Sequence, residues 1–204
     1  MAVSRFWFVL SALVVGLGSA WAVVRFGGEQ TAQAGAWRSE VLAGSVSAGP
    51  YTRARVAVGG LLALGPSETL YFVAEKDDAG RPLRTTCSYR VSGPVPDARW
   101  WSVTAYGADH FLLPAPDHRY SVNSAAGGMA GGEVSFVTGP QRPSLQDSSA
   151  GTAAALATAA TPWLPTPGDT GLLLVLRLYQ PGAALRRNAG ALLPLHISAL
   201  GRCP

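Results

Sequence analysis

The sequence predicts a mainly β domain, a sandwich or a barrel with one helix on its side or end, behind an N-terminal membrane helix. Three observations indicate this. The chain begins with a long uncharged apolar run. Several later segments have a period of two, in which alternate residues face opposite sides, as in β-strands. The composition of 24 Gly and 15 Pro with 14% charged residues is typical of short elements joined by many turns.

The N-terminal run, Phe6 to Val24, contains no charge and is bracketed by Arg5 and Arg25. At about 1.5 Å per residue it nearly matches a hydrocarbon core of about 30 Å. Trp7 and Trp21 stand near its two ends, where the membrane interface favours aromatic rings. We therefore expect a membrane-directed segment at residues 1–25.

Two fates of this segment stay open. Apolar Val23 and Val24 continue the run, which favours a retained anchor, whereas Ala20-Trp21-Ala22 fits the small-x-small pattern of a signal peptidase site. The short N-terminal side makes translocation of the long C-terminal part the simpler outcome. We expect a bacterial inner membrane location with the C-terminal domain in the periplasm, or secretion to the periplasm if the signal is cleaved.

The rest of the chain is long enough for one domain with a real core. Residues 26–50, rich in Gly, Ala and Ser, are expected to form a juxtamembrane linker, and residues 51–204 the β-sandwich domain. The 16 basic and 12 acidic residues are spread along the chain without a basic run, so nucleic-acid binding is not indicated. Almost every basic residue is Arg, which suits an anionic ligand or reflects a coding bias.

Cys87 and Cys203 are the two cysteines of the chain. No CxxC or Cys-His spacing occurs, so a structural zinc site is not expected, and no cofactor motif is present. In an oxidising compartment the pair is able to form a disulfide; the alternative is two unrelated thiols.

A helix is expected from Pro50 to Leu64, because Pro suits a first helical turn and apolar residues follow at helical spacing. The Gly65-Pro66 pair ends it. The later strands are expected at residues 68–75, 85–91, 98–106, 119–123, 133–138 and 172–179. A turn is expected at residues 77–80, and residues 139–161 read as a loop in which residues 153–160 offer a second short helix.

The chain resembles the family named domain of unknown function 1214 from about Trp37 to the C-terminus. The motifs that carry the resemblance are Tyr51-Thr52-Arg53-Ala54, Gly60 to Leu64, Glu68 with Tyr71, Gly80 to Leu83, Tyr89, Ala98 to Tyr106, Arg119 to Val122, Trp163-Leu164-Pro165 and Leu176 to Pro181. This resemblance implies a jelly-roll-like β-sandwich. In longer relatives the domain follows a partner, domain of unknown function 1254; we expect a short, membrane-anchored member that lacks it. Pro162 stands where relatives often have Asn.

The resemblance supplies no catalytic residue, and the sequence shows no G-x-S-x-G and no phosphate-binding loop. His110 and His118 read as loop residues rather than metal ligands. What remains is a set of arginines next to aromatic residues, able to line a pocket for a small anionic or apolar ligand. The candidate ligand-binding residues are Arg99, Trp100, Tyr106, Arg119, Tyr120, Arg177 and Tyr179.

We expect that a scaffold role dominates and that any binding site is drawn from neighbouring residues. The residues assigned mainly to the scaffold are Arg99, Trp101, Arg119, Trp163 and Arg177. Each Arg is able to stack on an aromatic ring or to pair with a carboxylate, and Glu68 is the partner expected for Arg177. Trp101 shares its strand face with Val103 and Ala105, which indicates the core.

Two functions follow for the domain. The favoured one is a non-catalytic, membrane-tethered envelope module that binds a ligand or partner. The rival is an enzyme that acts on a small, lipid-derived or anionic substrate. Convergence of Glu68, Asp109 and His110 in one concave site would favour the enzyme.

We predict that residues 6–24 stay in the mature protein as a single anchor, because the run has bilayer length. Intact-mass measurement on the membrane-extracted protein is expected to give the uncleaved chain. A mature chain that begins at Val23 would instead identify a cleaved signal peptide.

Overall fold

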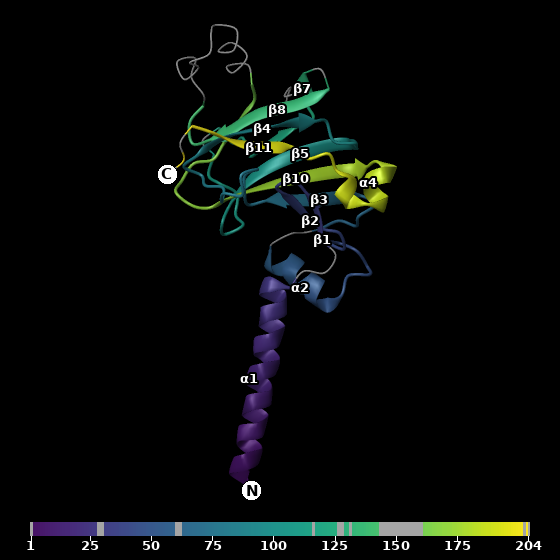
Figure 1. The fold of residues 1–204 in the computed structure, drawn as a ribbon, viewed down its shortest axis with the longest axis vertical. Coiled ribbons are helices and arrows are strands. Elements are labelled where there is room, and N and C mark those ends of the chain that lie inside the picture. Colours follow the sequence, from purple (N-terminus) through teal and green to yellow (C-terminus); the bar gives the residue numbers. More distant parts are fainter. Residues whose placement is uncertain are drawn as a thin grey trace.

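The computed structural model describes residues 2–27, 31–59, 63–115, 117–125, 129–130, 132–142, 161–201 and 203. Two β-sheets pack face to face around one hydrophobic core, and a long helix projects from them at the N-terminal end (Figure 1). The predicted class, a mainly β sandwich behind an apolar helix, is confirmed.

The projecting helix, α1, spans Ala2–Phe26. It is long and apolar enough to cross a membrane or to serve as a signal sequence, and its apolar part is not buried against the domain. Trp21 and Phe26 make an edge-to-face contact at its C-terminal end, with ring centroids 5.7 Å apart.

The larger sheet has six strands in the order β1-β2-β3-β10-β5-β6. Their bounds are β1 Thr31–Ala34, β2 Trp37–Glu40, β3 Thr69–Ala74, β10 Leu172–Pro181, β5 Ala98–Gly107 and β6 Ser121–Asn123. The smaller sheet has the order β11-β4-β8-β7, and β9 lies parallel to β8. Its strands are β11 His196–Leu200, β4 Ser88–Pro94, β8 Glu133–Gly139, β7 Met129–Ala130 and β9 Trp163–Pro165.

The core lies between the sheets. From the larger sheet it receives four leucines of β10 and alternate residues of β5, among them Trp101, which is 1% exposed. From the smaller sheet it receives Tyr89, Val91 and Phe136, each at most 1% exposed. The predicted strand faces are therefore correct, and the expected place of Trp101 in the core is confirmed.

Three short helical segments complete the described fold: α2 Pro50–Val58, α4 Ala183–Arg187 and a 3-10 turn, η2, at Ala189–Ala191. Helix α2 ends at Gly59, and residues 63–66 are not helical, so the prediction that the helix continues to Leu64 was wrong. Glycine loses more conformational entropy in a helix than other residues, which explains the early end. Residues 60–62 and the short helix considered at 153–160 lie outside the described residues.

The structure corrects the expectation that residues 26–50 form a linker. Within residues 26–50, β1 and β2 form a hairpin whose two-residue turn begins at Gly35, with φ +59°. This positive φ suits the turns that connect tight hairpins. Trp37 is fully buried, and its indole N–H donates to the Leu195 carbonyl at 2.6 Å. The hairpin is thus part of the sheet and of the core.

The turn predicted at residues 77–80 is confirmed, and a buried carboxylate organises it. Asp77 Oδ1 accepts from the backbone N–H groups of Ala79 and Arg81 at 3.0 and 2.9 Å, and Oδ2 accepts from the Arg81 guanidinium. Burial by itself raises the pKa of Asp77, but the hydrogen bonds and charge of Arg81 outweigh burial and lower the pKa below its ordinary value of 3.8. The ionised carboxylate is therefore part of the fold.

Cys87 and Cys203 lie at disulfide distance, with Cα atoms 5.5 Å apart, as predicted. Cys87 stands directly before β4, and Cys203 follows β11, the strand that pairs with β4. The bond joins residues 116 positions apart and fastens the end of the described chain to the smaller sheet.

We predict that this disulfide forms in the native protein and stabilises the domain. Closing a loop of this length contributes about 5 kcal/mol in the chain-entropy model, and commonly less in practice. Reductant is expected to lower the midpoint of chemical denaturation in wild type and to have no effect on a Cys87→Ser/Cys203→Ser variant. Alkylation of both thiols without reductant, in protein from its native membrane, would contradict the prediction.

We predict that Asp77→Asn lowers the free energy of unfolding by about 1–3 kcal/mol at neutral pH, because it removes a buried charge-assisted bond. The lowered pKa means that this contribution is present above pH 3.8 and is lost as the pH falls through the folded-state value. Denaturation curves of the two proteins are therefore expected to converge in acid. Asp169→Asn is the control, because its exposed pair with Arg84 contributes little. A gap between wild type and Asp77→Asn that persists in acid would contradict the role of the charge.

Candidate functional site

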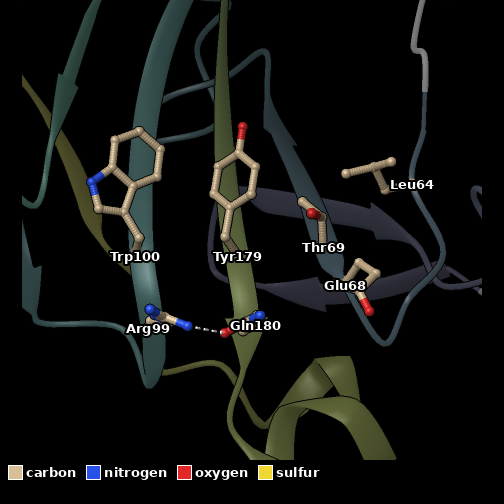
Figure 2. Close-up of a pocket in the computed structure, with 7 residues that line it drawn as sticks. All are labelled: Leu64, Glu68, Thr69, Arg99, Trp100, Tyr179 and Gln180. Atoms are coloured by element: carbon tan, nitrogen blue, oxygen red, sulfur yellow. Dashed lines mark hydrogen bonds between the residues drawn. The ribbon is translucent and has the colours of Figure 1, made fainter.

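A hollow of about 350 Å³ opens on the outer face of the larger sheet, where β3 and β5 begin and β10 ends. Figure 2 shows Trp100 and Tyr179 standing side by side on β5 and β10, with Thr69 on β3 next to them. Its walls are mainly apolar. The residues that line the hollow are Leu64, Glu68, Thr69, Arg99, Trp100, Tyr179 and Gln180.

Strand register brings the central three side chains together. Tyr179 pairs with Thr69 on one side and with Trp100 on the other. Because the neighbouring Leu178 points into the core, these three residues point outward. The rings of Trp100 and Tyr179 are tilted by 60°, with centroids 5.1 Å apart, a favourable aromatic arrangement. The pair offers a preformed apolar surface.

A backbone irregularity at Gln180 shapes one end of the hollow. Gln180 has φ +47°, and its N–H donates to the Glu68 carbonyl at 2.7 Å. Its side-chain Oε1 accepts from Arg99 Nη1 at 3.1 Å (Figure 2). A positive φ is costly for a residue other than glycine, and such strain is often kept at functional sites. The irregularity places the Arg99 guanidinium at the rim.

Thr69 is 1% exposed, and its hydroxyl has no hydrogen-bond partner among the described residues. A buried hydroxyl without a partner costs about 1–3 kcal/mol, so native proteins rarely keep one without a reason. Thr69 lines the hollow.

Arg177 occupies the next outward position of β10, about 7 Å along the strand from Tyr179. Nη1 donates to Thr104 Oγ1 at 2.9 Å, Nη2 donates to the Tyr106 hydroxyl at 2.6 Å, and the guanidinium lies 5.6 Å from the Tyr106 ring centroid. All these partners are uncharged. The half-buried Arg177 has no described carboxylate within salt-bridge distance.

The predicted ion pair between Arg177 and Glu68 was wrong. The register places Tyr71, not Glu68, opposite Arg177, and Glu68 lies before the start of β3. The guanidinium also extends toward Tyr106, away from the hollow's Tyr179. Glu68 instead contributes to the rim of the hollow.

Two of the seven candidate residues lie elsewhere. Arg119 ion-pairs with Asp117 at 3.6 Å and donates to the Trp163 carbonyl at 3.4 Å, beside β9. The Tyr120 hydroxyl lies 3.3 Å from His118 Nδ1. The other five form two neighbouring groups on one sheet face: Arg99, Trp100 and Tyr179 in the hollow, and Arg177 with Tyr106 beside it.

The groups that would favour an enzyme do not converge. Asp109 and His110 follow the C-terminal end of β5, whereas Glu68 lies near Arg99 at its start, about 30 Å away along a ten-residue strand. No base among the described residues is hydrogen-bonded to the Thr69 hydroxyl. Among the described residues, no group of three His, Cys, Asp or Glu side chains is placed to hold a metal ion.

Sequence reasoning did not place Leu64, Thr69 and Gln180 in a site. The alternation of β3 puts Thr69 and Tyr71 on one face, but only the register shows that this face meets Trp100. No local signal marks the positive φ of Gln180.

Comparison with one solved structure supports the fold. The VPA0106 protein from Vibrio parahaemolyticus aligns with a TM-score of 0.55 and 20% identity, over 76% of this chain and 36% of that protein. The present chain therefore spans about a third of that protein's length. An uncharacterised protein from Burkholderia cenocepacia aligns with a TM-score of 0.39 and 17% identity, over 67% of this chain and 31% of that one. No curated protein matches the chain.

The sequence model described as a protein of unknown function (DUF1214) matches residues 68–183, which include β3, β5, β10 and all but one of the residues that line the hollow. This match covers more than half of the chain, and the protein belongs to the DUF1214 family.

Proposed function

We propose that the protein is a non-catalytic binding module, tethered to the bacterial inner membrane by α1 with its β domain in the periplasm, and that it binds a small amphiphilic anion. The site is the hollow together with the adjacent Arg177. One observation carries the proposal: an aromatic hollow with an unpartnered Thr69 hydroxyl has Arg99 at its rim and Arg177 on the same sheet face, and neither guanidinium has a described carboxylate partner.

The apolar part of the ligand fits the hollow. Trp100 and Tyr179 offer their rings, and Leu64, which is 51% exposed, offers an aliphatic wall. Burying such surfaces contributes about 25 cal/mol per Å² of apolar area. Thr69 adds one hydrogen bond and so selects a ligand with a polar group near its apolar part.

The anionic part of the ligand fits Arg177. Thr104 and Tyr106 use hydroxyl oxygens to accept from the guanidinium, so both hydroxyl protons are free to donate. A carboxylate or phosphate there meets a cation and two hydroxyl donors, and hydrogen bonds to a charged group are stronger than neutral ones. Arg99 at the opposite end of the aromatic pair offers a second, more exposed contact.

We predict that medium-chain carboxylates bind more tightly than the corresponding alcohols. Thermal unfolding of the full chain in lipid nanodiscs, with each compound titrated, measures this preference. Arg177→Gln is expected to lower the affinity for the carboxylates about tenfold or more and to leave the alcohols nearly unchanged, since it removes one charge-assisted contact. Trp100→Ala is expected to weaken both classes.

Arg84→Gln is the matched control, because it removes an exposed guanidinium that is paired with Asp169. It is expected to keep wild-type affinity for both classes. Equal binding of alcohols and carboxylates by wild type, or unchanged carboxylate affinity in Arg177→Gln, would contradict the proposal.

A further inference from the structure

The end of α1 and the short helix α2 form a second exposed apolar surface. Phe26 is 75% exposed, Val58 is 74% exposed and Tyr51 is 40% exposed. We call these three residues the juxtamembrane face. They lie where α1 meets the domain, and α1 and α2 are in contact (Figure 1).

One arginine fixes the orientation of α2 against α1. Arg55 donates through Nη1 to the carbonyl of Gly27, directly after α1, and its Nε lies 2.7 Å from Glu40 Oε1 on β2. The Arg55 side chain is only 11% exposed. It therefore joins the end of the apolar helix, α2 and the larger sheet in one contact.

The same geometry determines which way α2 presents its apolar side chains. At 3.6 residues per turn, Tyr51 and Val58 lie within about 60° of Arg55 around the helix. Arg55 points to the end of α1, and Tyr51 and Val58, seven positions apart, lie together on one side of that direction. Thr52, which is fully buried, marks the side that faces the domain. The exposed apolar side chains of α2 thus lie on its α1 side.

The charges nearby suit a lipid surface. Arg25 is exposed in the last turn of α1, and Arg53 is exposed on α2; neither has a described carboxylate within salt-bridge distance. Arg53 donates to the carbonyls of Ala48 and Val46 at 2.9 and 3.0 Å and so holds the segment that leads into α2. An amphipathic helix with Arg beside its apolar face is typical of the membrane interface.

We propose that α2 lies in the headgroup region of the bilayer from which α1 emerges, with Tyr51 and Val58 in contact with the acyl boundary. This inference rests on the proposed retention of α1 as an anchor, and it does not depend on the ligand site. The bilayer is the occupant that the geometry favours, because the face continues directly from the helix that crosses it.

A fluorescent probe tests this proposal in the full chain. Val58→Cys is labelled with an environment-sensitive dye and reconstituted into vesicles of phosphatidylcholine and phosphatidylglycerol. Glu133→Cys is the control, because Glu133 is exposed at the start of β8, a strand on the side of the domain away from α1 (Figure 1). Intact mass first verifies that α1 is present.

The probe at position 58 is expected to show blue-shifted emission and quenching by lipids spin-labelled near the headgroup, whereas the probe at position 133 shows neither. Equal, unquenched emission at both positions would overturn the proposal. A blue shift that grows with the protein-to-lipid ratio would also overturn it, because a second copy would then cover the face. Carboxylate binding measured in the same vesicles separates these outcomes from a failure of the ligand site.

Discussion

The structure depends on the register of β10 between β3 and β5. Every second residue of this strand from Leu172 to Leu178 is a leucine that fills the core, while Arg177 and Tyr179 point outward. Because side chains alternate across a strand, a shift by one residue would place the guanidinium in the core and turn the four leucines to the outer face of the sheet. The burial of four leucines therefore selects one pairing, and this pairing also positions the outward residues.

The candidate site is a consequence of that constraint. Tyr179 meets Thr69 and Trp100 only because Leu178 meets Leu70 and Trp101 in the core. Arg177, the next outward residue of β10, accordingly donates to Thr104 and Tyr106 and has no described carboxylate within salt-bridge distance. The same strands thus pack in the core with one face and carry the candidate site on the other. Substitutions in the core are expected to disturb binding through the register rather than through contact with a ligand.

Local patterns were sufficient for some elements and insufficient for others. The alternation in β5 and β10 and the run of α1 are strong signals, and the structure has these elements close to where they were predicted. The strand predicted at residues 85–91 begins and ends three residues later, as β4, because residues 85–87 form a turn. The strands of the β1–β2 hairpin have only four residues each, too few for a clear alternation, and the indole of Trp37 is hydrogen-bonded to Leu195, more than 150 residues away. Likewise, the aromatic and Arg residues were recognised as candidates, but their division into separate groups follows from long-range pairing that no local pattern contains.

The place of β10 in the sheet has a consequence for how the chain acquires its structure. Its partners are far upstream, from Ala98 paired with Pro181 to Gly107 paired with Leu172. Until β10 is synthesised, β3 and β5 have no neighbour between them, and their apolar faces stay uncovered. Folding that depends on such distant strand pairs is slow, and strands that have not yet paired are prone to aggregate. A chain of this design benefits from chaperones that hold it unfolded until its last strands arrive.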